Sequence, residues 1–430
     1  MAEVLRDEAV DTPEEGAFRA RARVWLEANV AKRRVRGDDD EFEGGGESMF
    51  DEMGEQAEGA WLAKARALQA GLFDAGFAGI TWPKEHGGQG LSNRFQEIWV
   101  EEGAGYDLSA TGAFMIGLGM CGPTLVTMGT PEQKARYISP MLRGEELWCQ
   151  LFSEPGAGSD VASLQTRAVR DGDEFVVNGQ KVWTSGAHYA DYGILIARTD
   201  ADQPKHRGIS MFVLDMRTPG VTCKPLRQIT GGANFNEVFF DDARIPAENL
   251  VGELNEGWRG AITMLMNERV AIGAGGGGGM RGGGGALALV KLARERGVAG
   301  DRRVRQGIAD IYIRQTILGY IGMRIRDALK SGRVPGPEGS IAKLSGSQLG
   351  WRGAELGMAI AGAGSIAWDS GETKGSRLAM AVLGAPAGSM AGGTDQIQRN
   401  IIGERVLGLP KEPQVDRELP FRELKVGTQR

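Results

Sequence analysis

The sequence contains few of the residues that cross-link small secreted domains or bind metal ions. Its three cysteines, Cys121, Cys149 and Cys223, are far apart and odd in number. This usage favours a reducing compartment and excludes both a disulfide framework and a CxxC metal knuckle. With only three histidines in 430 residues, the sequence also has no HExxH-type zinc site.

Long apolar runs and a surplus of positive charge are absent as well. No run of about 18 apolar residues occurs, so we expect no membrane span. The formal net charge of -6 argues against nucleic acid as the main partner, because few basic groups remain to neutralise phosphates. The start, MAEVLRDEAVDTPEE, is acidic and unlike a signal peptide. We therefore expect a soluble, cytoplasmic protein.

Glycine, by contrast, is abundant. The 67 glycines are more than double the typical share of about 7%. Thirteen residues, GAGGGGGMRGGGG from Gly273 to Gly285, lie within a helical pattern, although each glycine costs about 1 kcal/mol relative to alanine inside a helix. This tract follows a helical pattern rather than a strand, so it does not predict a Rossmann dinucleotide site. No function is predicted for it.

The order of the predicted elements is helical, then β, then helical. Helical periodicity covers 17–31 and 61–75, and Thr130 with Gln133 predicts a capping box before a third helix. β-rich runs begin near Trp148 and end near Val251. Strands segregated from helices indicate an α+β fold. We predict an N-terminal helical domain (1–147), a middle β-domain (148–252) and a C-terminal helical bundle (253–430).

Within the β region, EFVVNGQKVW (Glu174 to Trp183) predicts a hairpin that turns at Asn178-Gly179. Further strands are expected in YGILIART, GISMFVLDM and NEVFFDDARI. After Glu253, helices are expected in NEGWRGAITMLMNERVAIG, ALALVKLARERG and RRVRQGIADIYIRQTILGYIGMRIRDALKSG.

Two loops of the β region carry groups suited to a flat, polar ligand. CQLFSEPGAGSD (Cys149 to Asp160) combines small residues, which let a ligand approach the backbone, with the hydroxyls of Ser153 and Ser159. WTSG (Trp183 to Gly186) places an indole beside two hydroxyls, which suits one face of a heterocycle. Taken singly, the first loop could be only a tight turn, and Trp183 only a core residue.

A third loop, MAGGTDQIQRN (Met390 to Asn400), precedes a predicted helix. The free N–H groups at a helix start favour a pyrophosphate. The sequence has no GxxxxGK[ST] phosphate loop. This third loop is therefore a candidate for holding a phosphorylated ligand.

Together these stretches resemble the acyl-CoA dehydrogenase family, in which EPGAGSD is followed by a Trp-x-Thr/Ser element. The matching stretches are long, ordered and correctly spaced. They are GITWPKEHGG (Gly79 to Gly88), GTPEQKARYISPMLRGEE (Gly129 to Glu146), the whole of Cys149 to Asp200, ARIPAENLVGELNEGW (Ala243 to Trp258) and GGTDQIQRNIIGERVLGLP (Gly392 to Pro410).

The resemblance implies an enzyme that binds FAD between the β-domain and a C-terminal four-helix bundle, usually in a tetramer. Phe152 and Ser153 would lie against the isoalloxazine, and a further set would complete the cofactor site. That set is Gly158, Ser159, Trp183, Thr184, Ser185, Arg296, Gly362, Thr394 and Gln396. Thr394 and Gln396 would reach the FAD of a neighbouring active site. Substrate contacts are implied for Ser159, Arg269 and Gly393.

The reaction implied by the resemblance, α,β-dehydrogenation of an acyl-CoA, needs a base for the α-proton. In much of the family this base is a glutamate two residues before the threonine of the third loop, where this sequence has Gly392. Some members supply it from the helix that opens the C-terminal domain, which matches Glu268. Met264, Leu265 and Ile272 share the helix face of Glu268, and burial on such a face would raise a carboxyl pKa. A structural ion pair is the commoner role for a helical glutamate. The backbone N–H of Gly392 would still polarise the thioester carbonyl.

Two family elements that reach across a subunit interface are eroded. Arg296 and Gly300 remain of one element, and Gly362 alone remains of the element from Met358 to Gly362.

The leading hypothesis is a catalytic, FAD-dependent acyl-CoA dehydrogenase in a homotetramer, with electron-transfer flavoprotein as electron acceptor. The alternatives are one subunit of a hetero-oligomer such as an α2β2 tetramer, or a catalytically silent CoA-binding homologue. In several members of the family a helix-borne base accompanies branched, long or bulky acyl chains, so the resemblance implies such a substrate.

Overall fold

The computed structural model describes residues 11–33, 54–274, 285–330, 337–366, 373–414 and 416–425. Most of the glycine-rich tract, residues 275–284, lies outside them. The described helices are α1 (Pro13–Asn29), α2 (Glu55–Asp74), α3 (Asn93–Gly103), α4 (Gly122–Met128), α5 (Pro131–Arg143), α6 (Gly257–Ala274), α7 (Ala286–Glu295), α8 (Arg302–Lys330), α9 (Glu338–Ala361), α10 (Thr373–Met390) and α11 (Asp395–Ile401). The strands are β1 (Trp148–Leu151), β2 (Arg167–Asp171), β3 (Glu174–Ser185), β4 (Tyr192–Arg198), β5 (Ile209–Asp215), β6 (Val221–Leu226), β7 (Phe235–Pro246) and β8 (Leu250–Val251).

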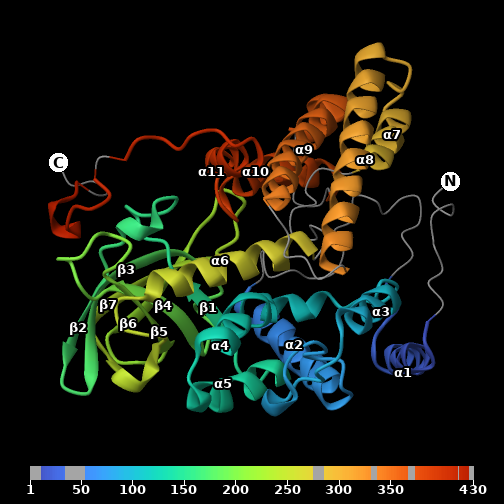
Figure 1. Ribbon diagram of the computed structural model, residues 1–430. Helices are drawn as coiled ribbons and strands as arrows, with labels where there is room; N and C mark the ends of the chain where they lie inside the picture. Colours follow the sequence, from blue (N-terminus) through green and yellow to red (C-terminus); the bar gives the residue numbers. More distant parts are fainter. Residues whose placement is uncertain are drawn as a thin grey trace.

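The helical–β–helical order confirms the α+β fold (Figure 1). The N-terminal helices lie beside the sheet, and the C-terminal helices α7 to α10 project away from it. Helix α6 runs between these parts (Figure 1). The domain boundaries proposed at 147/148 and 252/253 remain predictions.

Local sequence rules account for the start and end of α5. The Thr130 side chain accepts from the Gln133 N–H at 3.2 Å, and the Gln133 side chain accepts from the Thr130 N–H at 3.1 Å. Pro131 opens the helix, and Gly144, with φ of 78°, ends it in a left-handed conformation. The predicted capping box is therefore confirmed.

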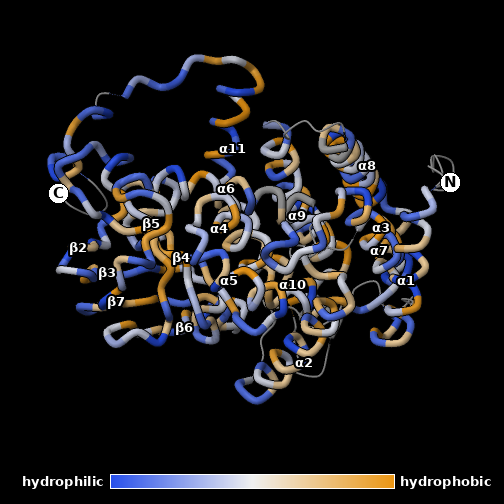
Figure 2. The backbone as a smooth tube through the Cα atoms, turned by 60° about the horizontal axis from the view of Figure 1, so that its bottom comes forward, coloured by the Kyte–Doolittle hydropathy of each residue, from blue (hydrophilic) through white to orange (hydrophobic). Residues whose placement is uncertain are grey.

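The sheet places its strands in the order β6-β7-β3-β2-β4-β5-β8, with β1 parallel to β4. Its central strands β4 and β5 are buried on both faces, so successive side chains enter different cores. Ile194 and Ile196 pack with the N-terminal helices and α6, whereas Leu195 and Ala197 pack inside the β-domain. Figure 2 shows hydrophobic residues along both strands.

The hairpin predicted at Asn178-Gly179 is wrong, because both residues lie inside the continuous strand β3. The turn is instead Gly172-Asp173, between paired Asp171 and Glu174. Asn178 bonds across to Asp242 of β7, donating at 2.9 Å and accepting from its N–H at 3.0 Å. A register shift follows at this point in β3.

Gly179 has a steric reason to be glycine. A Cβ at this position would lie 2.5 Å from Thr166 Oγ1 and 2.7 Å from Thr166 Cα. The Asn-Gly pair therefore makes a close backbone approach and a bulge rather than a turn.

The C-terminal helices pack on one another, with α9 in contact with α7, α8 and α10. Their common core includes Leu289, Ile311, Ile360 and Leu378. Among the helices that the structure describes, none has an 18-residue stretch apolar enough to cross a membrane.

Candidate active site

The two loops of the β-domain that carry polar groups are joined by a buried ion pair. Lys181, in β3, has no exposed surface. Its Nζ donates to the Phe152 carbonyl at 3.0 Å and to Glu154 Oε1 at 2.8 Å. The N–H of Val182 donates to the Ser153 carbonyl at 2.9 Å. These bonds hold Phe152 and Ser153 against the strand that leads to Trp183.

The charges of this pair are balanced by their surroundings. Burial would raise the pKa of Glu154, but Lys181 and the N–H groups of Gln165 and Thr166 outweigh burial and lower that pKa. Burial also lowers the pKa of Lys181, against the opposing effect of Glu154. Because each charge has a partner, the pair holds the loop without an uncompensated charge.

Trp183 has an unusual backbone conformation. Its φ is 60°, which bulky side chains rarely adopt, and the β3–β7 register shifts between Lys181 and Thr184. Trp183 is 61% exposed, and its ring meets the edge of Phe235 at 6.0 Å. The bulge therefore presents an indole at the surface, as a flat ligand requires.

Thr184 and Ser185 follow directly. Thr184 is buried, and its carbonyl accepts from Asn236 Nδ2 at 3.0 Å. Its hydroxyl Oγ1 is also buried and has no hydrogen-bond partner within the described ranges. Ser185 is half-buried and pairs with Phe235 across the sheet. The hydroxyl of Thr184 is thus suited to a ligand.

The structure brings the loop Met390–Asn400 to the Cys149–Asp160 loop of the same chain. Ser159 Oγ lies 3.4 Å from Thr394 Oγ1. Gly158, beside Ser159, is exposed and has open space where a Cβ would be. Thr394 therefore contacts Ser159 of its own chain. Its expected contact with the FAD of a neighbouring active site stays a prediction. Gln396 is exposed on α11.

Three side chains hold helix α11 and the loop before it. Thr394 caps it by accepting from the Ile397 N–H at 3.2 Å, as the loop-then-helix prediction requires. Asp395 accepts from Lys343 at 3.0 Å and from Ser347 at 2.7 Å, both on α9. Gln398 Nε2 donates to the Gly392 carbonyl at 2.8 Å. The loop therefore has a defined shape before any ligand binds.

Gly392 and Gly393 have φ of 65° and 84°. Side chains other than glycine rarely adopt such angles. The Gly393 carbonyl accepts from Gln398 Nε2 at 3.3 Å. Position 392 therefore lacks a carboxylate and also has a backbone conformation in which a glutamate would be strained.

Glu268 lies on α6, which contacts β5, α4 and α9. Met264 is fully buried, and Leu265 packs against the same core. Glu268 is half-buried one turn later, and its neighbour Asn267 donates to Thr124 Oγ1 at 3.3 Å. The side chains of Arg269 and Ile272 lie outside the described part of the chain, so their predicted positions stay predictions.

Arg296 lies beside the turn that begins at Gly362. Arg296 follows α7, and its Nη atoms lie 3.8 and 3.9 Å from the point where a Cβ of Gly364 would be. Gly362 has φ of 67° and opens the turn Gly362–Ser365, in which the Ser365 hydroxyl donates to the Gly362 carbonyl at 2.7 Å. The exposed guanidinium lies beside a small-residue turn.

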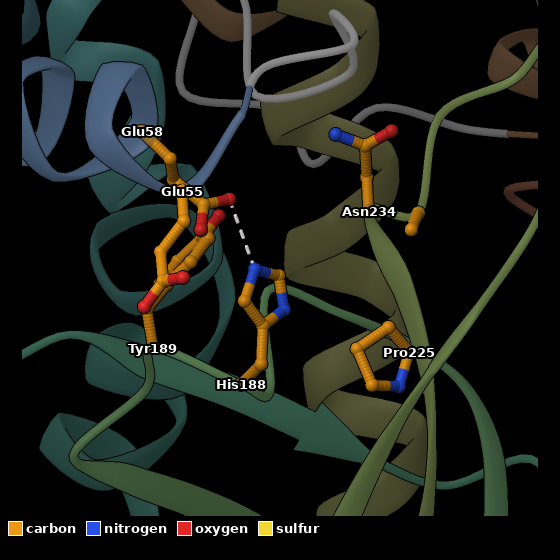
Figure 3. Close-up of a pocket in the computed structure, with 7 residues that line it drawn as sticks. Glu55, Glu58, His188, Tyr189, Pro225 and Asn234 are labelled. Atoms are coloured by element: carbon orange, nitrogen blue, oxygen red, sulfur yellow. Dashed lines mark hydrogen bonds and ion pairs between the residues drawn. The ribbon is translucent and has the colours of Figure 1, made fainter.

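A cavity of about 390 Å³ is lined in part by the loop that follows β3. It is bounded by α2 on one side and by β-domain loops on the other (Figure 3). Its lining residues are Glu55, Glu58, His188, Tyr189, Pro225, Ala233 and Asn234. His188 Nε2 lies 2.9 Å from Glu58 Oε1, and the Asn234 carbonyl accepts from the Gly186 N–H at 2.9 Å. This cavity was not anticipated from the sequence.

Comparison with known proteins identifies the family. Residues 12–145, 149–243 and 255–407 match the N-terminal, middle and C-terminal domains of acyl-CoA dehydrogenases. Acyl-CoA dehydrogenase IpdE1 of Mycobacterium tuberculosis is 37% identical over 403 residues, which are 92% of this chain and 98% of IpdE1. The chain belongs to the acyl-CoA dehydrogenase family. Acyl-CoA dehydrogenases are flavin-dependent oxidoreductases, so the resemblance and the enzyme class inferred from the motifs are confirmed.

Other relatives of this acyl-CoA dehydrogenase differ in length. Acyl-CoA dehydrogenase FadE34 of Mycobacterium tuberculosis is 40% identical over 347 residues, which cover 80% of this chain and 46% of FadE34. Among solved structures, the Tcur3481-Tcur3483 steroid ACAD has a TM-score of 0.73 and 28% identity, covering 93% of this chain and 99% of that one. The ChsE4-ChsE5 complex from Mycobacterium tuberculosis has a TM-score of 0.69 and 27% identity, covering 93% and 99%.

The residues of this chain fit the FAD that family members bind. An exposed indole at Trp183 offers a stacking face, and the buried Thr184 hydroxyl lacks a partner in the described structure. Ser159 and Thr394 place two hydroxyls together beside exposed backbone at Gly158. These groups suit the ring system and the phosphates of a dinucleotide, respectively.

The sequence analysis missed the residues that support these groups. Lys181 and Glu154 are 27 residues apart, and Glu58 and His188 are 130 apart. Lys181 lies between Gln180 and Val182, a local pattern that does not predict burial of the lysine. Asp395 and Asn236 carry no local signal either.

Proposed function

We propose that this acyl-CoA dehydrogenase removes the α-proton and β-hydride of an acyl-CoA thioester to give the 2-enoyl-CoA, with Glu268 as base. The proposal rests on the arrangement of two loops. The loops that carry Ser159 and Thr394 are in contact, and in the second loop position 392 is a glycine with a positive φ instead of a glutamate. A half-buried carboxylate on α6 supports the assignment to Glu268.

The residues divide the work of binding and proton transfer. FAD, when bound, supplies the acceptor for the hydride. Phe152, Ser153 and the Trp183–Ser185 bulge would hold its ring system. The hydroxyls of Ser159 and Thr394 would hold phosphate groups, with Gln396, Arg296 and Gly362 completing the cofactor contacts. The Gly392 N–H would polarise the thioester carbonyl, which acidifies the α-carbon.

Substrate contacts are proposed for Ser159, Arg269 and Gly393, and a bulky acyl group for the substrate. A relative among the solved structures is described as a steroid ACAD, which supports an acyl chain carried by a polycyclic ring system. Electron-transfer flavoprotein is the proposed electron acceptor.

Anaerobic bleaching of the bound flavin tests this function. Polycyclic, long and branched acyl-CoA thioesters are mixed in turn with the FAD-loaded protein, and bleaching is expected with the bulkiest. Glu268→Gln should slow bleaching by on the order of 10²-fold or more while leaving FAD bound. Glu355→Gln, an exposed glutamate of α9, is the control. Near-normal bleaching by Glu268→Gln would show that the base is elsewhere. No bleaching of wild type by any thioester would favour a silent CoA-binding homologue.

A second candidate is a subunit of a hetero-oligomer. Two of the similar solved structures are described by pairs of chains, Tcur3481-Tcur3483 and ChsE4-ChsE5. The exposed Arg296 beside the Gly362–Ser365 turn is a cofactor surface that another chain could share. Expression of this chain alone, followed by a count of FAD per protomer, separates the candidates. Full occupancy supports a homo-oligomer, and occupancy that needs a co-expressed partner supports the hetero-oligomer.

A further inference from the structure

His188 is held from two sides by groups of different parts of the molecule. Its Nε2 lies 2.9 Å from Glu58 Oε1 on α2, and its Nδ1 lies 3.1 Å from Asn236 Nδ2 on β7. Figure 3 shows the contact with Glu58 as a dashed line across the cavity. The imidazole therefore bridges the N-terminal helices and the β-domain.

The hydrogen-bond partners assign the tautomer of His188. Asn236 is fully buried, and its Nδ2 also donates to the Thr184 carbonyl at 3.0 Å. An amide nitrogen has two hydrogens, so one serves Thr184 and the other serves His188 Nδ1. Nδ1 is then an acceptor, and Nε2 carries the hydrogen donated to Glu58. Each donor in the chain from Thr184 to Glu58 has one acceptor.

Thr184 depends on this chain because it directly follows the bulge at Trp183. The β3–β7 register resumes at Thr184, opposite Asn236, and it is the Asn236 side chain that binds the Thr184 carbonyl. If the amide of Asn236 turned over, its oxygen would face the Thr184 carbonyl oxygen and repel it. His188, as an acceptor, favours the orientation in which the nitrogen faces both.

We propose that His188 is a positioning residue for the flavin, holding the Asn236 amide and thereby the Trp183–Ser185 bulge in their binding geometry. Glu58 completes the network by fixing the imidazole from α2. The inference rests on the proposed function, in that Trp183, Thr184 and Ser185 line the cofactor. Its consequence is that a residue of the N-terminal helices sets the shape of a cofactor wall in the β-domain.

Arg66 supplies a matched control for this network. It lies two turns beyond Glu58 on α2 and also reaches the loop after β3, where its Nη2 lies 3.1 Å from Asp191 Oδ2. The Arg66 contact joins the same two parts of the molecule without passing through Asn236. Arg66 Nη1 also donates to the carbonyls of Gly144 and Glu145. Arg66→Met therefore removes contacts that do not involve Asn236, whereas His188→Leu removes the link to Thr184.

The test is FAD titration of apoprotein, with the dissociation constant, followed by quenching of tryptophan fluorescence, and the visible absorption band as readouts. His188→Leu and Glu58→Ala should each weaken FAD binding by about tenfold and shift the absorption band. The double variant should bind no more weakly than His188→Leu alone. Glu58→Gln, which keeps an acceptor oxygen, should restore both readouts. Arg66→Met should match wild type in both.

Several results would overturn the proposal. The network would be an ordinary interface contact if His188→Leu kept the wild-type FAD affinity and spectrum. The same would follow from additive losses of affinity in the double variant, or from an equal loss of affinity in Arg66→Met. Glu58→Ala, on the partly exposed start of α2, tests the same network if His188→Leu does not fold. A wild-type chain that binds no FAD overturns the proposed function as well, whereas normal binding by the variants overturns the positioning role alone.

Discussion

The β-domain and the C-terminal helices use apolar residues in opposite ways. In the β-domain, Ile194, Leu195 and Phe212 are fully buried, and even the charge of Lys181 is enclosed. On α8, by contrast, large apolar side chains are exposed. They are Tyr312 at 59%, Ile313 at 55%, Ile317 at 52%, Tyr320 at 59% and Met323 at 42%.

The difference lies in how much apolar surface each region covers with its own chain. The exposed residues of α8, which we call the α8 stripe (Tyr312, Ile313, Ile317, Tyr320 and Met323), fall on one face of the helix by their spacing. Apolar groups gathered on one face of a soluble protein usually mark an interface. The β-domain buries its apolar residues within the chain, whereas the α8 stripe is the surface on which the proposed oligomer would pack.

Removing the buried charge in the β-domain should have the largest effect on stability. Lys181→Met leaves Glu154 buried without its cation, which costs about 3–5 kcal/mol. Urea denaturation of the holoprotein, followed by circular dichroism, measures this loss in the free energy of unfolding. Flavin release should precede the main transition, because the Phe152 carbonyl also loses its donor.

The double variant Lys181→Met with Glu154→Gln is the control for charge. The N–H groups of Gln165 and Thr166 donate to different oxygens of Glu154, and the amide of Gln has one oxygen, which keeps one of these two bonds. Part of the lost stability should therefore return. If the double variant is less stable than Lys181→Met alone, the cost came from packing rather than from an unpaired charge.

Placing a charge in the α8 stripe should have the next largest effect, on assembly. Ile317→Arg should raise the dissociation constant of the proposed oligomer by roughly 30-fold, the size of an interface hot spot. Sedimentation velocity over a range of concentrations measures the shift. Val169→Arg is the control, since Val169 is 58% exposed on β2 but lies outside the stripe. Equal assembly of both variants would contradict the comparison.

The sequence predicted well where structure depends on neighbours along the chain, and on motifs shared with a family. The Thr130 capping box, the strands β4 and β5 and the family itself followed from such patterns. It failed at Asn178-Gly179, where the close approach of Thr166 and the bond to Asp242 turn an apparent hairpin signal into a bulge. Pairs such as Glu58 and His188 are set by the tertiary fold, which no local pattern encodes.

A smaller effect is expected where α11 is tied to α9. Asp395→Asn removes a charge that accepts from Lys343 and Ser347, at a local cost on the order of 1–2 kcal/mol. Hydrogen exchange of the α11 amides should accelerate, while exchange in the β-domain should not change. Unchanged α11 exchange would show that the Gln398 contacts hold the loop by themselves.

The same carboxylate makes α11 sensitive to acid. Burial would raise the pKa of Asp395, but bonds from Ser347 and Lys343 outweigh burial and lower that pKa below its ordinary value of 3.8. The folded carboxylate therefore holds its proton less tightly than in the unfolded chain. Its stabilising contribution is complete above about pH 4 and is lost as the pH falls through the lowered pKa. Asp395→Asn should remove this part of the acid sensitivity of α11 exchange.

The smallest effect is expected at an exposed ion pair of the same sheet that holds Lys181. Arg244 on β7 lies 3.0 Å from both Asp171 and Glu174, and all three side chains are substantially exposed. Water screens such pairs, and the side chains lose conformational freedom to form them. Arg244→Met should therefore leave the urea midpoint unchanged within error. Arg244 and Lys181 each pair with carboxylates in the same sheet. A large loss of stability in Arg244→Met would therefore mean that burial does not explain the large effect expected for Lys181→Met.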